Sequence, residues 1–313
     1  MKQMTIIVPC YNEQAAIPLF YQRLKKILGN YVDEYAGHQW DLLFVDDGST
    51  DDSLTQMERL QVSDPEHVHF LSFSRNFGKE AALYAGLENA DAEYVGVMDV
   101  DLQDPPELLP QMITYLDSGD YDTVATKRDS RKGEPIVRSF FSKMFYKLIN
   151  RISQTPIPEG ARDYRLMNRK VVDAVLAMPE VNRFSKGIFN WVGFRTKVLT
   201  FDHQERVAGE THWSFKQLVS YSFEGIMDFS DKPLTIASVV GGASFVLSIF
   251  SLIFIVIRAL VFGDPTAGWP SLVSIILMIG GIQLFCLGIA GKYIAKIYLE
   301  VKQRPVYITR EQK

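Results

Sequence analysis

The stretch YVGVMDVDLQDPPE, residues 94–107, decides the fold because its character changes part-way. Its first five residues form a short apolar run typical of a buried strand, and carboxylates follow at once. Four more runs of this kind are separated by segments with helical spacing of apolar residues, as in 15–28 and 79–89. These runs are 4–8, 41–45, 67–73 and 122–126. The alternation predicts an α/β fold with a mainly parallel sheet and helices on both faces.

Polar clusters follow four of the predicted strands. They are PCYNE (9–13), DDGSTDD (46–52), SRNFGKE (74–80) and DVDLQD (99–104). Taken alone, each cluster has a structural explanation. PCYNE is compatible with the end of a strand, DDGSTDD with a turn and a helix cap, and SRNFGKE with a basic loop. Because the carboxyl ends of parallel strands meet at one edge of a sheet, where ligands bind in such folds, their coincidence favours a functional site.

The acidic cluster predicts a metal site. One residue separates Asp99 from Asp101, and in an extended chain this spacing points both side chains to one face. Two adjacent carboxylates repel unless a cation neutralises them, and Mg²⁺ or Mn²⁺ prefers oxygen ligands. Gln103 adds an amide oxygen on the same alternation. Asp104 and Glu107 are expected to be helix caps or first-turn charges instead.

Two long uncharged segments, 235–257 and 271–291, predict transmembrane helices at 235–262 and 271–291, after a catalytic domain at 1–230. The connector between them is short, so both chain ends should lie on one side. A basic tail, 292–313, follows the second helix, whereas Arg258 is the only base in the connector, which predicts cytoplasmic termini in a multi-pass protein of the cell membrane. The net charge of −4 gives no global basic footprint for nucleic acid.

Residues 136–152 have an apolar stripe and a basic face, which is typical of a helix lying in the membrane surface; a buried core helix is the alternative. Arg138 and Ser142 are one helical turn apart in it and can point to one anion. A second amphipathic stretch, 213–229, leads toward the first transmembrane segment.

Four motifs together carry a resemblance to a known family. VPCYNE, VDDGSTDDS, FSRNFGKEAAL and DVDLQDPPE, in this order, resemble the inverting GT-A glycosyltransferases of family 2, which have a Rossmann-like sheet. The branch is that of dolichol-phosphate mannose synthase and the bacterial polyprenyl-phosphate glycosyltransferases, whose bacterial members also end in two membrane helices. The chain contains neither a GxGxxG fingerprint after the first strand nor a P-loop motif, which disfavours a dinucleotide dehydrogenase and a P-loop enzyme.

The resemblance implies roles for individual residues. Those expected around the nucleotide sugar are Pro9, Tyr11, Glu13, Asp46, Arg75, Lys79 and Arg206. Those expected to hold Mg²⁺ or Mn²⁺ against the diphosphate are Asp99, Asp101 and Gln103. Those expected at the acceptor phosphate are Arg128, Arg138 and Ser142.

Two further positions complete the implied site. Asp163 matches the acidic residue proposed as the catalytic base of this branch. A phosphate acceptor is already mostly ionised at neutral pH, so orienting the acceptor is the alternative role of Asp163. His212 replaces the familiar lysine after Arg206, and neutral histidine weakens the case for a second cation there.

We therefore expect a membrane-bound transferase that moves glucose or N-acetylglucosamine from a UDP-sugar to polyprenyl phosphate on the cytoplasmic face, with inversion, for cell-envelope glycosylation. A processive polysaccharide synthase is disfavoured because a QxxRW motif is absent. A GDP-mannose-dependent mannose synthase and a non-catalytic membrane scaffold remain alternatives. The oligomeric state, including a homo-oligomer, stays open.

Overall fold

The computed structural model describes residues 2–34, 38–128, 161–202, 232–262 and 268–313. The chain divides into two compact units. The first comprises residues 1–225 together with 304–313, and the second comprises 226–303.

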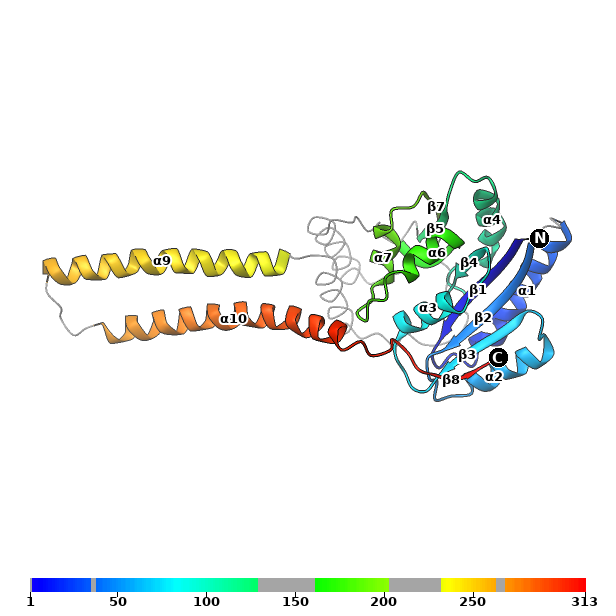
Figure 1. The fold of residues 1–313 in the computed structure, drawn as a ribbon, viewed down its shortest axis with the longest axis horizontal. Coiled ribbons are helices and arrows are strands. Elements are labelled where there is room, and N and C mark those ends of the chain that lie inside the picture. The colour runs from blue at the N-terminus through cyan, green and yellow to red at the C-terminus, as the bar shows by residue number, and fades with distance from the viewer. Residues whose placement is uncertain (1, 35–37, 129–160, 203–231, 263–267) are drawn as a thin grey trace. The chain divides into compact units, whose positions relative to one another are not determined.

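The first unit is built on one eight-stranded sheet in the order β7-β5-β6-β4-β1-β2-β3-β8 (Figure 1). β1 lies between β2 and β4 and is parallel to both, and β3 is parallel to β2. β6 and β8 run antiparallel to their neighbours, whereas β5 and β7 are parallel to each other. The strands are β1 Lys2–Cys10, β2 His38–Asp46, β3 Val68–Phe73, β4 Tyr94–Val97, β5 Thr123–Arg128, β6 Ala161–Asn168, β7 Thr196–Phe201 and β8 Thr309–Gln312.

Helices cover both faces of this sheet. Alternate side chains of β1 explain why, since Ile6 packs in the core that contains Phe20 and Met112, whereas Ile7 faces α3 on the other side. A Cβ on Gly86 of α3 would lie 2.2 Å from Cγ2 of Ile7, so glycine lets helix and sheet approach closely. The helices are α1 Ala16–Glu34, α2 Ser53–Ser63, α3 Lys79–Glu88, the 3₁₀ turn η1 Pro106–Leu108, α4 Leu109–Asp117, α6 Arg169–Leu176 and α7 Ser185–Trp191.

The fold class is therefore confirmed: a mixed, mostly parallel α/β sheet followed by two long apolar helices. All five predicted strands are present, and the predicted helices at 15–28 and 79–89 correspond to α1 and α3. In the described parts of the chain, β6, β7 and β8 are additions that the apolar patterning did not predict.

The second unit contains α9, Lys232–Phe262, and α10, Trp269–Val301. The two helices contact each other, for example where Sγ of Cys286 lies 3.2 Å from the carbonyl oxygen of Ala237. Windows at Lys232–Ser251 and Met278–Val301 are long and apolar enough to cross a membrane, with mean hydropathies of 1.9 and 1.4. Most of their large apolar side chains are exposed, as Phe250 and Leu284 are. Such faces suit contact with lipid and indicate association with a membrane.

Residues 292–313, expected as a basic tail, contain regular structure. α10 continues to Val301, and residues 309–312 form β8 at the edge of the catalytic sheet. The tail is thus basic in sequence but structurally part of the first unit from Arg304 onward.

Candidate active site

The polar clusters gather at the carboxyl edge of the parallel strands. The connections of β1 and β4 lead in opposite directions along the sheet, to β2 and to β5 respectively, and ligands bind at such a point in open α/β folds. At the end of β2, Asp46 is buried and accepts hydrogen bonds from the Ser72 hydroxyl at 2.7 Å and the Ser49 amide at 2.9 Å. The carboxylate is therefore fixed between β3 and the loop that follows β2.

Reciprocal hydrogen bonds join the loops that follow β1 and β2. The amide of Asn12 donates to Ser49 Oγ at 3.0 Å, and its side-chain oxygen accepts from the Thr50 amide at 2.8 Å. Asn12 has a φ of 57°, a left-handed conformation that asparagine tolerates better than most residues. Around this turn lie three residues predicted to contact the donor, Pro9, Tyr11 and Glu13, of which Tyr11 is exposed.

Asp47 and Gly48 have a structural role that the sequence analysis did not assign. The buried carboxylate of Asp47 accepts hydrogen bonds from the amides of Phe77 at 2.6 Å and Gly78 at 2.9 Å. A Cβ on Gly48 would lie 2.3 Å from the backbone carbon of Arg75, and its φ of 66° also favours glycine. The loop after β2 thereby shapes the loop at 74–78, which leads to Lys79.

The DVD motif lies in a turn, so the expectation of an extended chain was wrong. β4 ends at Val97, and Leu102 has a φ of 56°. Asp101 is buried and its Oδ1 accepts a hydrogen bond from the Gln103 amide at 3.1 Å. A turn at residues 100–101 therefore takes the place of the expected alternation.

Asp104 was also predicted wrongly, because it is not a helix cap. It is fully buried and pairs with Nε of Arg162 at 2.8 Å, while its Oδ2 has no hydrogen-bond partner. Burial raises the pKa of Asp104 to about 6, although Arg162 opposes the shift. Asp104, Asp99 and Asp101 together raise the pKa of the Arg162 guanidinium against the effect of its burial. Glu107 does lie in the first turn of η1 and pairs with Arg23.

These groups are compatible with a divalent cation that takes its remaining ligands from a substrate. No group of three His, Cys, Asp or Glu side chains within the described ranges could hold a metal by itself. Asp99 and Asp101 supply two hard oxygen donors, and the buried Oδ2 of Asp104 is a further carboxylate oxygen without a hydrogen-bond partner. Mg²⁺ sites completed by phosphate oxygens need only one or two carboxylates.

Lys79 joins the acidic turn to β6. Its Nζ lies 2.6 Å from Oδ1 of Asp99 and 2.8 Å from Oδ2 of Asp163. β6 is antiparallel to β4 with Val97 opposite Arg165, so continuing the register by two residues brings Asp163 beside Asp99. The predicted catalytic and metal-binding carboxylates thus share one ammonium group.

The surroundings of Asp163 are strongly cationic. Burial alone would raise its pKa, but Lys186 and Lys79 lower the pKa well below the ordinary range. The Lys79 side chain is 41% exposed, and the desolvation that it does undergo opposes its charge, but Asp163 and Asp99 raise its pKa above the ordinary value. Both groups are therefore charged at neutral pH, and Asp163 accepts a proton poorly.

Lys186 was missed by the sequence analysis. It lies in α7, next to Ser185, whose amide donates a hydrogen bond to Oε2 of Glu80 at 2.9 Å. Arg165 lies nearby on β6 with its Cζ 3.7 Å from the ring centre of Phe189. The available signal was RFSKG at 183–187, where basic residues interrupt a largely apolar stretch.

The remaining predicted residues divide into two groups. Arg128 is the last residue of β5 and Arg75 is exposed in the loop after β3. Arg138, Ser142, Arg206 and His212, with the amphipathic stretches 136–152 and 213–229, lie outside the described residues. The acceptor-phosphate group therefore stays a prediction.

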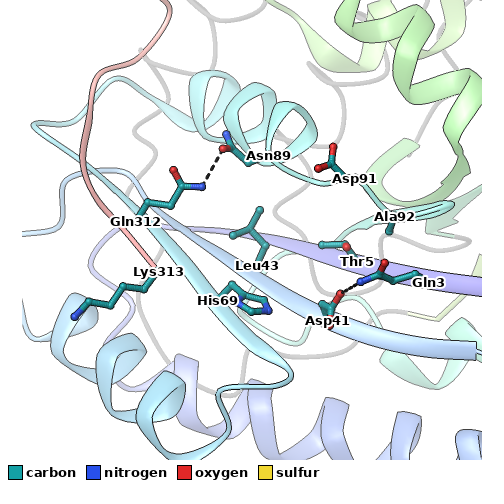
Figure 2. Close-up of a pocket in the computed structure, with 10 residues that line it drawn as sticks. All are labelled: Gln3, Thr5, Asp41, Leu43, His69, Asn89, Asp91, Ala92, Gln312 and Lys313. Atoms are coloured by element: carbon teal, nitrogen blue, oxygen red, sulfur yellow. Dashed lines mark hydrogen bonds between the residues drawn. The ribbon is translucent and has the colours of Figure 1, made fainter.

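A cavity of about 240 Å³ lies at the other end of the sheet (Figure 2). It is lined by the early residues Gln3 and Thr5 of β1 and Asp41 of β2, together with Asn89 after α3 and Gln312 of β8. Its lining shares no residue with the carboxyl-edge cluster, so it is a separate feature.

Comparison with known proteins establishes the family. The model of "Glycosyl transferase family 2" matches residues 5–176, which include all four motifs and Asp163. The chain belongs to glycosyl transferase family 2. The bactoprenol glucosyl transferase of Shigella phage SfII is 42% identical over 311 residues, covering 99% of this chain and 98% of that protein.

Two other similar proteins span most of this family 2 chain. The prophage bactoprenol glucosyl transferase homolog of Escherichia coli strain K12 is 39% identical over 316 residues, covering 99% of both chains. Among solved structures, the mannosyltransferase PcManGT from Pyrobaculum calidifontis, in complex with GDP-Man and Mn²⁺, has a TM-score of 0.46 and 16% identity, covering 94% of this chain and 87% of that one. The family match establishes that the protein is a glycosyltransferase.

Proposed function

We propose that this glycosyltransferase moves glucose from UDP-glucose to a polyprenyl phosphate, with inversion at the anomeric carbon, on the cytoplasmic face of a membrane. The observation that carries the proposal is the bridge from Lys79 to Asp99 and Asp163 at the carboxyl edge. It supports a transfer site with two proposed halves, in a chain whose full-length relatives include bactoprenol glucosyl transferases.

The donor is proposed to lie across the loops after β1, β2 and β3. Tyr11 and Arg75 are exposed there, whereas Asp46 is held by the Ser72 and Ser49 hydrogen bonds. We therefore assign Asp46 the role of supporting the loops of the donor site. The exposed ring of Tyr11 can stack on a nucleotide base, and the exposed guanidinium of Arg75 can bind a negatively charged phosphate. Arg206 is proposed as a further contact to the diphosphate.

Asp99, Asp101 and Gln103 are the residues proposed to hold Mg²⁺ or Mn²⁺. When bound, the cation would neutralise charge on the departing nucleoside diphosphate. Lys79 lies beside the same carboxylate and places a second positive charge at this edge. The leaving group becomes more negative as the reaction proceeds. A positive charge that is already fixed at that position lowers the barrier to displacement.

The acceptor is proposed to be a lipid phosphate held by Arg128, Arg138 and Ser142. One phosphate oxygen attacks the anomeric carbon, the bond from that carbon to the diphosphate oxygen breaks, and UDP leaves with the electron pair. A phosphate dianion has no proton to lose, so no strong base is required. The depressed pKa of Asp163 supports an orienting role for this carboxylate.

The apolar helices α9 and α10 support an acceptor drawn from a membrane. Cytoplasmic placement of the catalytic unit and both termini is proposed from the asymmetry of basic residues around the two spans. Labelling of single cysteines at positions 268 and 310 in intact cells tests it, after replacement of Cys10 and Cys286. Reaction at 268 alone with an impermeant reagent supports the proposal, and reaction at 310 contradicts it.

The decisive experiment supplies membranes containing the protein with polyprenyl phosphate and a panel of radiolabelled UDP-glucose, UDP-N-acetylglucosamine and GDP-mannose. We expect label in the lipid fraction from UDP-glucose, and none from membranes lacking the protein. Transfer only from GDP-mannose would establish the mannose-synthase alternative. Wild-type cellular behaviour of an Asp101→Asn variant, with no transfer from any donor, would instead support a scaffold.

A further inference from the structure

The C-terminal strand reaches the start of the loop at 74–78. β8 pairs antiparallel with β3, with Ser72 opposite Glu311 and Phe73 opposite Thr309 across an irregularity. Beyond this ladder, the Ser74 amide donates a hydrogen bond to the Ile308 carbonyl at 2.9 Å. Since Ser74 is the first residue of the loop, the tail fixes the point where the loop leaves the sheet.

Tyr307 contacts both elements that flank the loop. Its ring stacks on Phe73 of β3, with centroids 5.0 Å apart and planes inclined by 24°. Its hydroxyl donates to Oε2 of Glu88 at 2.6 Å and accepts from Nδ2 of Asn89 at 3.1 Å, at the end of α3. Burial and the hydrogen bond to Glu88 raise the pKa of Tyr307 to about 12, so the hydroxyl keeps its proton at neutral pH.

A second tail contact holds the same helix end. Nε2 of Gln312 donates to Oδ1 of Asn89 at 3.1 Å, as Figure 2 shows. Tyr307 and Gln312 thus both bond to Asn89, one through each atom of its amide group. The tail therefore contacts both β3 and α3. Lys79, the residue expected near the nucleotide, is the first residue of α3.

The ring of Phe73 continues the contact into the loop. Phe73 meets Phe77 edge to face, with centroids 5.7 Å apart, and Cζ of Arg75 lies 3.9 Å from the ring centre of Phe77. A series of ring contacts therefore runs from Tyr307 through Phe73 and Phe77 to the exposed guanidinium of Arg75. On the other side, Asp47 fixes the loop through the Phe77 and Gly78 amides.

We propose that Tyr307 is a positioning residue for donor binding and that the contacts of Tyr307, Ile308 and Gln312 hold the donor loop in its binding conformation. The inference rests on the proposed function in one respect, namely that Arg75 and Lys79 face the nucleotide. An edge strand also needs cover to avoid pairing with other chains. Covering the edge of β3 would require only backbone pairing by β8. It would not require the stacking of Tyr307 on Phe73 or the hydrogen bonds to the end of α3.

The test uses the full-length protein in detergent and measures UDP affinity by calorimetry in the presence of Mn²⁺. Tyr307→Phe removes the hydroxyl but keeps the ring, and loss of its hydrogen bonds should weaken UDP binding about three- to tenfold. Tyr307→Ala removes the stack as well and should weaken binding by roughly ten- to fiftyfold. Arg310→Ala is the matched control, since its side chain is exposed on the same tail, and should bind UDP as the wild type does.

Two further readouts separate positioning from mere stability. The Michaelis constant for polyprenyl phosphate should stay within about twofold of wild type, and amide hydrogen exchange should accelerate in residues 74–79 but not in β1. A lower melting temperature in Tyr307→Ala with unchanged UDP affinity and unchanged exchange at 74–79 would overturn the proposal. Failure of the wild type to bind any nucleotide would overturn the proposed function instead, and the exchange measurement would still decide the role of Tyr307.

Discussion

The ammonium group of Lys79 lies 2.8 Å from the carboxylate of Asp163, although 84 residues separate them in the chain. The contact exists because β6 runs antiparallel to β4 and starts where the parallel strands end. Lys79 also touches Asp99, so one cation links the proposed metal site to the proposed acceptor site. Removing this charge should affect both.

Replacing Lys79 by Met should lower kcat by roughly ten- to a hundredfold, the scale of losing one fixed electrostatic stabiliser. Burial then acts on Asp163 with less opposition, so its pKa should rise, although Lys186 continues to lower it. A depressed carboxylate pKa keeps the group charged until the pH falls through that low value. The acidic limb of the kcat profile should therefore move to higher pH in the variant.

Lys25→Met is the control for this change. Lys25 also pairs with a carboxylate, Asp64, at 2.8 Å, but on α1 and away from the carboxyl edge. The control should keep the kcat and pH profile of the wild type. The role assigned to Lys79 is wrong if Lys79→Met behaves like the control.

Chelation should abolish transfer, and Mg²⁺ or Mn²⁺ should restore it. Asp101→Asn should lower kcat by about a hundredfold or more and weaken Mn²⁺ binding, measured by electron paramagnetic resonance. Asp91→Asn removes one charge from an exposed carboxylate beside the cavity of Figure 2 and should leave both quantities unchanged. Full activity in chelator would show that transfer proceeds without a divalent ion.

The sequence predicts the parallel part of the sheet well because its strands are buried on both faces. Runs such as 42–45 are continuously apolar, and their residues are almost entirely buried in the structure. β8 carries no such signal, since TREQ is polar and pairs along one edge only. Its position depends on backbone hydrogen bonds to β3, which any sequence can make, so periodicity does not reveal it.

The errors in the site have a similar origin. The positive φ of Leu102 turns the DVD segment, and no glycine or asparagine marks that turn in the sequence. Asp104 is buried by β6, which supplies Arg162 from 58 residues away. The ends of the predicted strands therefore indicate which residues meet at the carboxyl edge. Which side chains form ion pairs there depends on β6, which is distant in sequence.

Gly48→Ala should weaken donor binding about tenfold or more. The added Cβ meets the Arg75 backbone, and the left-handed φ of 66° adds strain of roughly 1–2 kcal/mol for a residue other than glycine. Gly29→Ala is a matched control within α1, where nothing lies within 4 Å of the added carbon. It should leave donor binding unchanged and stabilise the fold by about 0.5–1 kcal/mol. UDP titration and thermal unfolding of both variants measure these effects, and equal UDP affinity in both would contradict the role given to Gly48.

Asp64 should make the folded state sensitive to acid. Its carboxylate bonds to the Tyr21 hydroxyl at 2.6 Å, Lys25 at 2.8 Å and His67 at 2.8 Å. Burial acts to raise its pKa, but Lys25, Tyr21 and His67 together lower the pKa well below the ordinary value. A group with a depressed folded pKa contributes stability above its ordinary pKa of about 3.9, and that stability is lost as pH falls through the folded value.

Asp64→Asn should therefore lower the free energy of unfolding at pH 7 by about 1–3 kcal/mol. The difference from wild type should shrink as the pH is lowered below about 4. Chemical unfolding followed by circular dichroism between pH 3 and pH 8 measures it. A difference that stays constant over this range would show that the charge of Asp64 is not the cause.

The proposed acceptor site rests on residues outside the described part of the chain, so its test is kinetic. Arg138 and Ser142 are one helical turn apart in sequence, and Arg128 ends β5 at the carboxyl edge. Arg138→Ala should raise the Michaelis constant for polyprenyl phosphate on the order of ten- to a hundredfold, the effect of losing one charge-assisted contact. The affinity for UDP-glucose should remain nearly unchanged.

Arg206→Ala should give the reverse pattern, with weaker donor binding and an unchanged acceptor constant. The pair of variants thus assigns each arginine to one substrate, because a general loss of folding would affect both constants in both proteins. Steady-state kinetics with each substrate varied in turn separates the two effects. If Arg138→Ala weakens the donor and leaves the acceptor constant alone, residues 136–152 contact the nucleotide sugar and the lipid phosphate binds elsewhere.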